Sequence, residues 1–184
     1  MFKNGGKMVK FIKKQRLLFL VVFVVSQLHE FGHVIGYSIE NVSIKFHYGY
    51  VEPLNGKIGV LGIMGGPIVS ILFAIIPLII LSIVRKYNYV LSIISLASSL
   101  SRVSAYALYL VFLPFNENIF MINDEGQAAK LLGINPVFFY VASIIVYILS
   151  IIFIRKCGIH DKKKYWSVFL SILIYNVIVL LTMI

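Results

Sequence analysis

The sequence predicts an all-α polytopic membrane protein with about five transmembrane helices and a small β-hairpin. Of its 184 residues, 60% are hydrophobic and only 13% are charged, and the mean hydropathy is +0.94. A soluble domain is about 45–50% apolar and about 25% charged. These values exclude a soluble enzyme, a disordered tail and a coiled coil, and the length fits a single transmembrane domain over residues 1–184.

Five apolar runs are long enough to cross a bilayer, which requires about 20 mostly apolar residues per helix. In chain order they are 17–38, 66–84, 89–113, 136–154 and 166–184. The basic N-terminus followed by an apolar run is similar to a signal peptide, but no small-residue cleavage site follows the run. We therefore expect the first run to be an uncleaved anchor.

The connection at 40–64 has a different pattern. Val42, Ile44, Phe46 and Tyr48 alternate with more polar residues, and the segment 53–56 supplies turn residues. This pattern predicts a β-hairpin of about five residues per strand between the first two helices. An irregular interfacial loop fits the same segment equally well.

The net charge of +10 comes from the ends of the apolar runs. Six basic residues precede the first run, two lie at 85–86 and five at 155–164, so 13 of the 17 Lys and Arg fall on one side if the helices alternate. Because Lys and Arg are in excess on the cytoplasmic side, we expect an integral, multi-pass protein of the cell membrane with a cytoplasmic N-terminus. The lipid bilayer, rather than nucleic acid, is the expected partner of these charges. The lone Cys157 excludes an intramolecular disulfide.

One motif in the first helix carries chemistry, namely His29-Glu30-Phe31-Gly32-His33. Two histidines four residues apart share a helix face, so both imidazoles can reach one metal ion, and Glu30 beside them could act as a general base on water. An ionisable residue in the centre of an apolar span costs about 2.5–3.5 kcal/mol, so these side chains need a metal, a partner or water. The alternative is that the two histidines only hydrogen-bond neighbouring helices.

Catalytic zinc usually takes three protein ligands, so two histidines leave such a site incomplete. Asp124 and Glu125 follow an apolar segment on the same side of the membrane as the motif, which lies about 18–24 Å from the inner end of its helix. Asn123 or Asp124 could also cap a short helix that ends near Gly133. The other candidates for the third ligand are His47, His160, Glu40, Glu52 and Glu117.

The run 89–113 carries a polar stripe at three- and four-residue spacing, which should face protein rather than lipid. Its members are Ser95, Ser98, Ser99, Arg102, Tyr106 and Tyr109. Arg102 could neutralise an acid near the metal or stabilise an oxyanion, or it could simply join helices, which is the role that we favour. We expect Gly62, Gly65 and Gly66 to allow close packing.

These motifs together resemble the site-2 protease family of intramembrane zinc metalloproteases. The helix with His29–His33 and Gly36 looks like that family's HExGH helix, Gly66-Pro67 looks like its glycine-proline motif, and Asn123–Gly126 is similar to its asparagine/aspartate-glycine motif. The likeness covers about residues 17–135, and residues 136–184 add C-terminal helices.

The resemblance implies that His29, His33 and Asp124 bind Zn²⁺ and that Glu30 is the general base. It also implies hydrolysis of a peptide bond in or next to a transmembrane segment of a membrane protein or peptide, presented as a strand to the hairpin. Two departures stand out. Ser70 replaces an asparagine that assists oxyanion binding, and Glu125 interrupts the aspartate-glycine pair and is a rival ligand.

We therefore expect a zinc-dependent intramembrane endopeptidase, with Ser70 and Arg102 as oxyanion or supporting groups. The alternative function is a non-proteolytic membrane metal-binding protein or transporter that uses the same His and Asp ligands.

Overall fold

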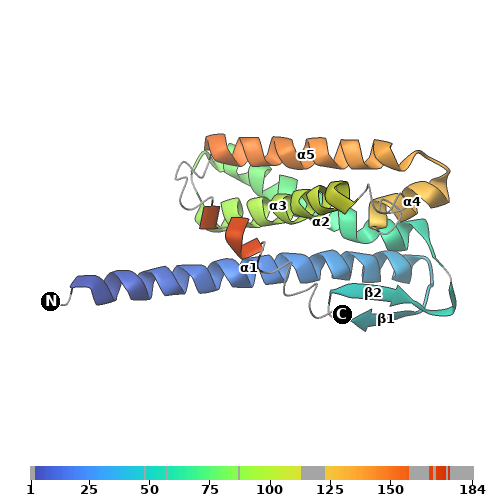
Figure 1. The fold of residues 1–184 in the computed structure, drawn as a ribbon, viewed down its shortest axis with the longest axis horizontal. Helices are drawn as coiled ribbons and strands as arrows, with labels where there is room; N and C mark the ends of the chain where they lie inside the picture. Colours follow the sequence, from blue (N-terminus) through green and yellow to red (C-terminus); the bar gives the residue numbers. More distant parts are fainter. Residues whose placement is uncertain are drawn as a thin grey trace.

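In the computed structural model, long apolar helices form one bundle, and a short helix and a two-stranded sheet lie together at one end of it (Figure 1). The structure describes residues 3–47, 49–56, 58–86, 88–112, 123–157 and, in part, 166–174. The elements are α1 (Lys3–Ile39), β1 (Ile44–His47), β2 (Tyr50–Pro53), η1 (Leu54–Gly56), α2 (Val60–Val84), α3 (Tyr89–Phe112), α4 (Asp124–Leu132) and α5 (Pro136–Cys157).

This architecture confirms the predicted all-α polytopic membrane fold with a small β element. Four helices within the described residues are long and apolar enough to cross a membrane, over Arg16–Ile39, Val60–Val84, Tyr89–Ala107 and Pro136–Lys156. The predicted fifth span, 166–184, lies largely outside the described residues, so the count of five stays a prediction.

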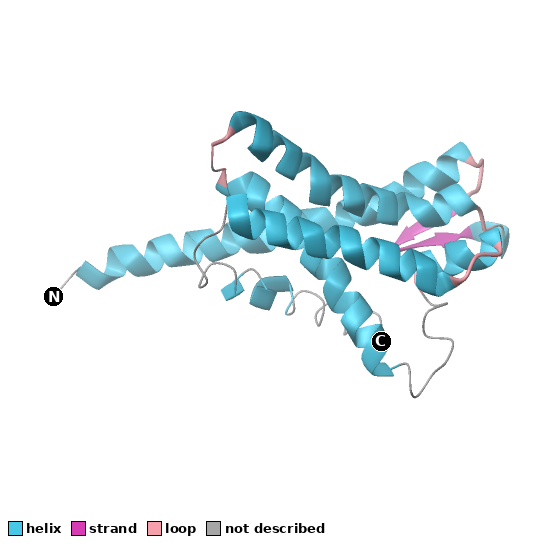
Figure 2. Ribbon diagram, turned by 90° about the horizontal axis from the view of Figure 1, so that it is seen from above, coloured by secondary structure: helices cyan, strands magenta, loops and turns pink. Residues whose placement is uncertain are grey.

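The helix ends differ from the sequence prediction at two places. Helix α1 begins at Lys3, and its first part projects beyond the bundle as a single helix (Figure 2). Helix α2 begins at Val60 rather than near 66 because Glu40 provides acceptors for its first turn. The Glu40 carboxylate accepts from the backbone N–H groups of Leu61 and Gly62, at 2.9 and 2.8 Å. These donors have no partner inside the helix, so the carboxylate stabilises an early start.

The predicted hairpin exists, but its turn was assigned to the wrong residues. Strands β1 and β2 pair antiparallel with His47 opposite Tyr50, so the chain reverses between these two residues and not at 53–56. Gly49 adopts a φ of 85°, which glycine reaches without the steric cost that a Cβ brings. Residues 54–56 instead form the short helix η1, which leads into α2.

Glycines bring α1 and α2 close together. A Cβ on Gly32 would meet the backbone carbonyl of Gly65, and a Cβ on Gly36 would meet that of Leu61. Small residues allow helix backbones in a membrane to approach and gain van der Waals contact. This confirms the close packing predicted for the glycines at the start of α2.

The two ends of the bundle have different interiors. At one end, which we call the apolar end, the buried side chains are Leu18, Val22, Leu78, Ile93, Leu96, Ala97, Leu100, Ile154 and Ile172. The opposite end, which we call the polar end, gathers His29, Glu30, His33, Arg102, Asp124 and Glu125. Between these ends, large apolar side chains on the outer faces of α2 and α5 are exposed, as lipid contact requires.

Candidate metal centre

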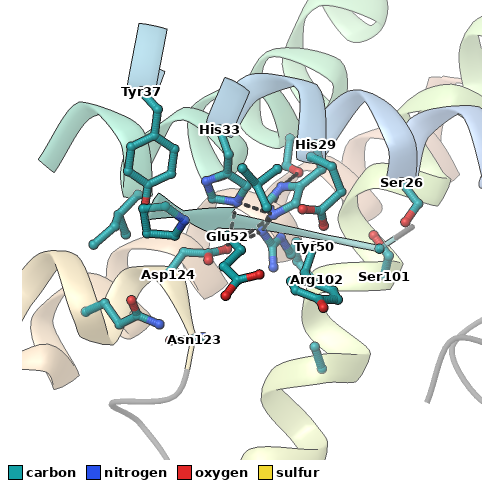
Figure 3. A pocket seen from close by; sticks show the side chains of 18 of the residues that line it. Ser26, His29, His33, Tyr37, Tyr50, Glu52, Ser101, Arg102, Asn123 and Asp124 are labelled. Carbon is teal, nitrogen blue, oxygen red and sulfur yellow. Dashed lines mark hydrogen bonds and ion pairs between the residues drawn. The ribbon is translucent and has the colours of Figure 1, made fainter. Parts of the chain in front are cut away.

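Three side chains from two helices converge at the polar end (Figure 3). His29 and His33 of α1 are 9% and 6% exposed, and their Nε2 atoms lie 3.2 Å apart. Asp124, the first residue of α4, places Oδ2 at 3.2 Å from His29 Nε2 and 3.5 Å from His33 Nε2. These are the three residues that the sequence and the family resemblance nominated as metal ligands.

The spacing of these atoms fits a small divalent cation. At metal–ligand distances of about 2.0–2.1 Å, neighbouring ligand atoms of a tetrahedral zinc site lie about 3.3 Å apart. The observed separations of 3.2, 3.2 and 3.5 Å match the three edges of one face of such a tetrahedron. The structure therefore contains a His29–His33–Asp124 group that could hold a metal ion.

The other nitrogen of each imidazole has a hydrogen-bond partner on α2. His33 Nδ1 donates to the carbonyl oxygen of Gly62 at 2.8 Å, and His29 Nδ1 lies 2.9 Å from Ser70 Oγ. A proton on Nδ1 leaves the Nε2 lone pair free, and such partners fix the orientation of ligand histidines. Between the oxyanion and supporting roles expected for Ser70, this contact favours support.

Gly66 gives the two imidazoles the space that they occupy. A Cβ at this position would lie 2.6 Å from His29 Nε2 and closer still to His33 Nε2. Any other residue at 66 would therefore displace the candidate ligands. The predicted close packing at Gly66 is thus confirmed, and the groups that pack there are the ligands themselves.

Asp124 is held by the start of its own helix. Asn123 caps α4, since its side chain accepts from Gly126 N at 3.1 Å, and Gly133 ends the helix with a φ of 66°. Capping by Asn123 leaves the Asp124 carboxylate free to face the histidines. Burial by itself raises the pKa of this carboxyl, but hydrogen bonds with both imidazoles and the charge of Arg102 hold its pKa well below the ordinary value.

Arg102 of α3 contacts two of the three candidate ligands, His29 and Asp124. Its Nη2 donates to Asp124 Oδ2 at 3.1 Å, lies 2.7 Å from His29 Nδ1 and also contacts His29 Nε2. A guanidinium has no lone pair to offer, so Arg102 supplies charge and not a ligand. A metal ion on His29 Nε2 together with a proton on Nδ1 requires this Nη2 to move off both ring nitrogens, and the flexible side chain can do so while keeping Asp124 as its acceptor.

Glu30 lies beside the ligands in a cavity of about 680 Å³. The cavity is walled by α1, α3, the first turns of α4 and the hairpin, with Gly49–Pro53 among its lining residues. The polar end holds the carboxylates of Glu30, Asp124 and Glu125 against one guanidinium, so a divalent cation would bring the formal charge of the fully ionised set to zero. The charge balance thus favours a divalent ion.

The other candidate ligands make different contacts. Glu40 caps α2, and Glu52 pairs with His47 on the hairpin at 3.2 Å. Glu125, the rival to Asp124, accepts from the hydroxyl of Tyr106 instead of facing the histidines. Glu117 and His160 lie outside the described residues. The polar stripe of α3 faces protein as predicted, with Ser95, Ser98 and Ser99 fully buried.

Sequence reasoning missed several neighbours of the site. Tyr37 lies one turn beyond His33 on the same helix face and lines the cavity, a spacing that the sequence does contain. The Gly62 carbonyl carried no signal, because any residue has a backbone acceptor. Nor did the sequence indicate that Tyr140 of α5 would donate to Asn123 Oδ1.

We compared the chain with known proteins for independent support of this site. Comparisons with protein families, with curated proteins and with solved structures find no match for this chain. The geometry of the candidate metal centre and the motifs of the sequence are therefore the features that indicate a function.

Proposed function

We propose that this protein is a zinc-dependent intramembrane endopeptidase of the site-2 protease type. The observation that carries the proposal is the group formed by His29, His33 and Asp124, with Glu30 beside it, inside a cavity among membrane-length helices. A metal that only joined helices would need neither an adjacent carboxylate nor a cavity. Two imidazoles, a carboxylate and a neighbouring glutamate are typical of metal-dependent hydrolysis.

Zinc bound by such ligands supplies Lewis acidity, which makes water a competent nucleophile near neutral pH. Glu30 would accept a proton from the attacking water and then deliver it to the leaving amine of the peptide. Its place on the helix turn that carries both histidines keeps it within reach of the same water. Arg102 brings a positive charge toward the oxygen that gains negative charge in the transition state.

The shape of the cavity supports a peptide substrate. Its lining residues on α1 run from Val25 to Tyr37, about 18 Å along the helix axis. An extended peptide rises about 3.3 Å per residue, so five or six residues fit beside the ligands. Because β2 forms part of the wall, its backbone could pair with a substrate strand. We infer that the substrate is a membrane protein or peptide that locally unwinds at the cleaved bond.

The location follows from the charges. We infer a multi-pass protein of the cell membrane with a cytoplasmic N-terminus, because the basic residues gather on one side of the expected spans. The candidate metal centre would then lie in the outer half of the membrane. Cysteine labelling at Ser38 and at Lys86 in intact cells tests this orientation, with Ser38 expected to be accessible from outside and Lys86 protected.

The test of the function is Glu30→Gln in purified protein reconstituted with a single-span substrate. The variant should keep about one zinc per chain and lose at least 99% of cleavage, because general acid–base catalysis contributes about 10²–10⁴-fold. Elemental analysis for zinc and iron is the internal control, since two histidines and a carboxylate also suit iron(II). If the wild type holds zinc but cleaves no substrate, a metal-binding or transport function replaces the proposal. If Glu30→Gln cleaves normally, Glu30 is not the general base.

A further inference from the structure

Glu125 is the most deeply buried acidic or basic side chain among the described residues, at 1% exposed. It has no role in the proposed mechanism. A carboxylate removed from water is costly unless opposite charge and hydrogen bonds compensate it. A buried carboxylate at the polar end of an apolar helix bundle therefore requires a structural or functional explanation. Its place in the chain suggests one, because it directly follows Asp124.

The contacts of Glu125 lie on the face of α3 that also binds Asp124. Its Oε1 accepts from the hydroxyl of Tyr106, which places the Glu125 carboxylate against α3. Arg102 and Tyr106 are four residues apart, so they occupy one face of α3 one turn apart. Helix α3 therefore contacts the first turn of α4 at two neighbouring points, Arg102 with Asp124 and Tyr106 with Glu125.

A third contact fixes the same turn from α5. Tyr140 donates to Asn123 Oδ1, the oxygen that also caps α4. Asn123 thus contacts α5, Asp124 contacts the two histidines and Arg102, and Glu125 contacts Tyr106 of α3. The position of Asp124 Oδ2 relative to the histidines depends on this turn, because Asp124 is the only one of the three ligands outside α1.

The charges give Glu125 a second effect on the metal centre. Without Glu125, the Arg102 charge would be balanced by Asp124 alone. Arg102 would then hold the Asp124 carboxylate more tightly, and its uncompensated charge would repel a divalent cation nearby. With Glu125 present, a second negative charge, at Tyr106 one helix turn along α3, also offsets the guanidinium, and Asp124 is left available to the metal.

We propose that Glu125 is a positioning residue of the metal centre, which places Asp124 and offsets the charge of Arg102 without itself binding the ion. This inference depends on the metal site of the proposed function but not on proteolysis. Glu125→Gln keeps the acceptor for Tyr106 and removes the charge, and it should weaken zinc binding by about 10- to 100-fold, as loss of a supporting carboxylate does. Tyr106→Phe, which removes only the hydrogen bond, should weaken zinc binding about three- to tenfold.

Two further variants separate positioning from simple packing. Tyr147→Phe is the matched control, because Tyr147 is fully buried beside Tyr106 and its hydroxyl has no hydrogen-bond partner within the described part of the chain. It should bind zinc within twofold of the wild type. Glu125→Gln combined with Arg102→Gln restores the charge balance, so the pair should bind zinc more tightly than Glu125→Gln alone. A packing defect would not be rescued in this way.

The experiment measures zinc affinity by chelator competition on detergent-purified full-length protein, together with the visible absorption of the Co²⁺ form. We expect the affinity order wild type and Tyr147→Phe, then Tyr106→Phe, then Glu125→Gln, with an altered Co²⁺ spectrum only in the last two. Wild-type affinity and spectrum in Glu125→Gln would overturn the inference while leaving the proposed function intact. Conversely, an inactive wild type that binds zinc with this affinity order would reject proteolysis and uphold the positioning role. A wild type without metal would reject both.

Discussion

The apolar and polar ends of the bundle share helices α1, α2 and α3 but are held together differently. At the apolar end, Leu18, Ile93, Leu96, Ile154 and other aliphatic side chains fill the space between the helices. At the polar end, glycines let α1 and α2 touch, and hydrogen bonds and charges hold α4 in place. We conclude that one end provides packing while the other concentrates the groups that need a partner.

This division has a physical reason. Lipid tails are as apolar as leucine side chains, so packing in a membrane depends on van der Waals contact rather than on removal from water. Polar groups in the same solvent must find each other or a metal. A substitution at the apolar end should therefore leave zinc affinity nearly unchanged, and a substitution at the polar end should leave the packing of the apolar end nearly unchanged.

The largest expected effect is the loss of a ligand at the polar end. Zinc affinity in small proteins corresponds to about 10–16 kcal/mol, so removing one of three protein ligands should cost about 3 kcal/mol, or 100-fold or more in affinity. His33→Ala should show this loss in chelator competition. The matched control is His47→Ala, a histidine on the hairpin that pairs with Glu52 and should keep full zinc content. Equal losses in both variants would reject the assigned ligands.

A cavity at the apolar end should affect stability instead. Leu96 is fully buried, and Leu96→Ala would leave a void. In soluble proteins such a change lowers the free energy of unfolding by about 2–5 kcal/mol. In a membrane the contribution from transfer out of water is absent, so we expect a loss of about 1–3 kcal/mol. Zinc content should be unchanged. Leu72→Ala, on the exposed face of α2, is the control and should be near neutral. Zinc loss in Leu96→Ala at native conditions would show that the two ends are coupled.

Two buried serines sharpen the comparison. Ser70 supports the candidate ligand His29, whereas Ser92 donates to the backbone carbonyl of Asn88, the residue just before its own helix, at 2.9 Å. Ser70→Ala should weaken zinc binding about tenfold, since outer partners of ligand histidines contribute about 10–100-fold. Ser92→Ala should leave zinc affinity unchanged. The same titration of both variants measures the difference, and its absence would remove the supporting role of Ser70.

The smallest expected effect concerns the start of α2. In the wild type, the two carboxylate oxygens of Glu40 accept from the backbone N–H groups of Leu61 and Gly62. Glu40→Gln removes the negative charge and leaves one side-chain oxygen as an acceptor. We expect a loss of about 1 kcal/mol in stability, as for other caps, and no more than a few-fold change in zinc affinity. Amide hydrogen exchange at residues 61–63 should rise in the variant. Unchanged exchange would indicate that Glu40 does not set the start of the helix.

The sequence predicted those features that follow from local patterns. Apolar runs gave the helices, and the spacing of His29 and His33 placed both on one face with Glu30 beside them. Asn123 or Asp124 and Gly133 marked the ends of α4 because caps depend on single residues, and the structure shows Asn123 to be the cap. The predicted position of the hairpin turn was wrong because 53–56 contain several residues typical of turns. A single glycine at position 49 is a weaker turn signal in the sequence.

The remaining features depend on tertiary contacts that no local pattern encodes. Asp124 could not be separated from Glu125 by residue type, and only the opposite directions of their side chains show that one meets the histidines and the other Tyr106. Arg102 was expected mainly to join helices, yet it contacts the candidate ligands directly. The carbonyl of Gly62 had no sequence signal at all.

Zinc K-edge X-ray absorption of the purified wild-type protein tests the central claim most directly. It should show about one zinc per chain with nitrogen and oxygen ligands only at about 2.0–2.1 Å, two of them imidazoles, and the Asp124→Ala variant should lose the metal. Absence of zinc in the wild type, or the same zinc content and ligand set in Asp124→Ala, would contradict the account.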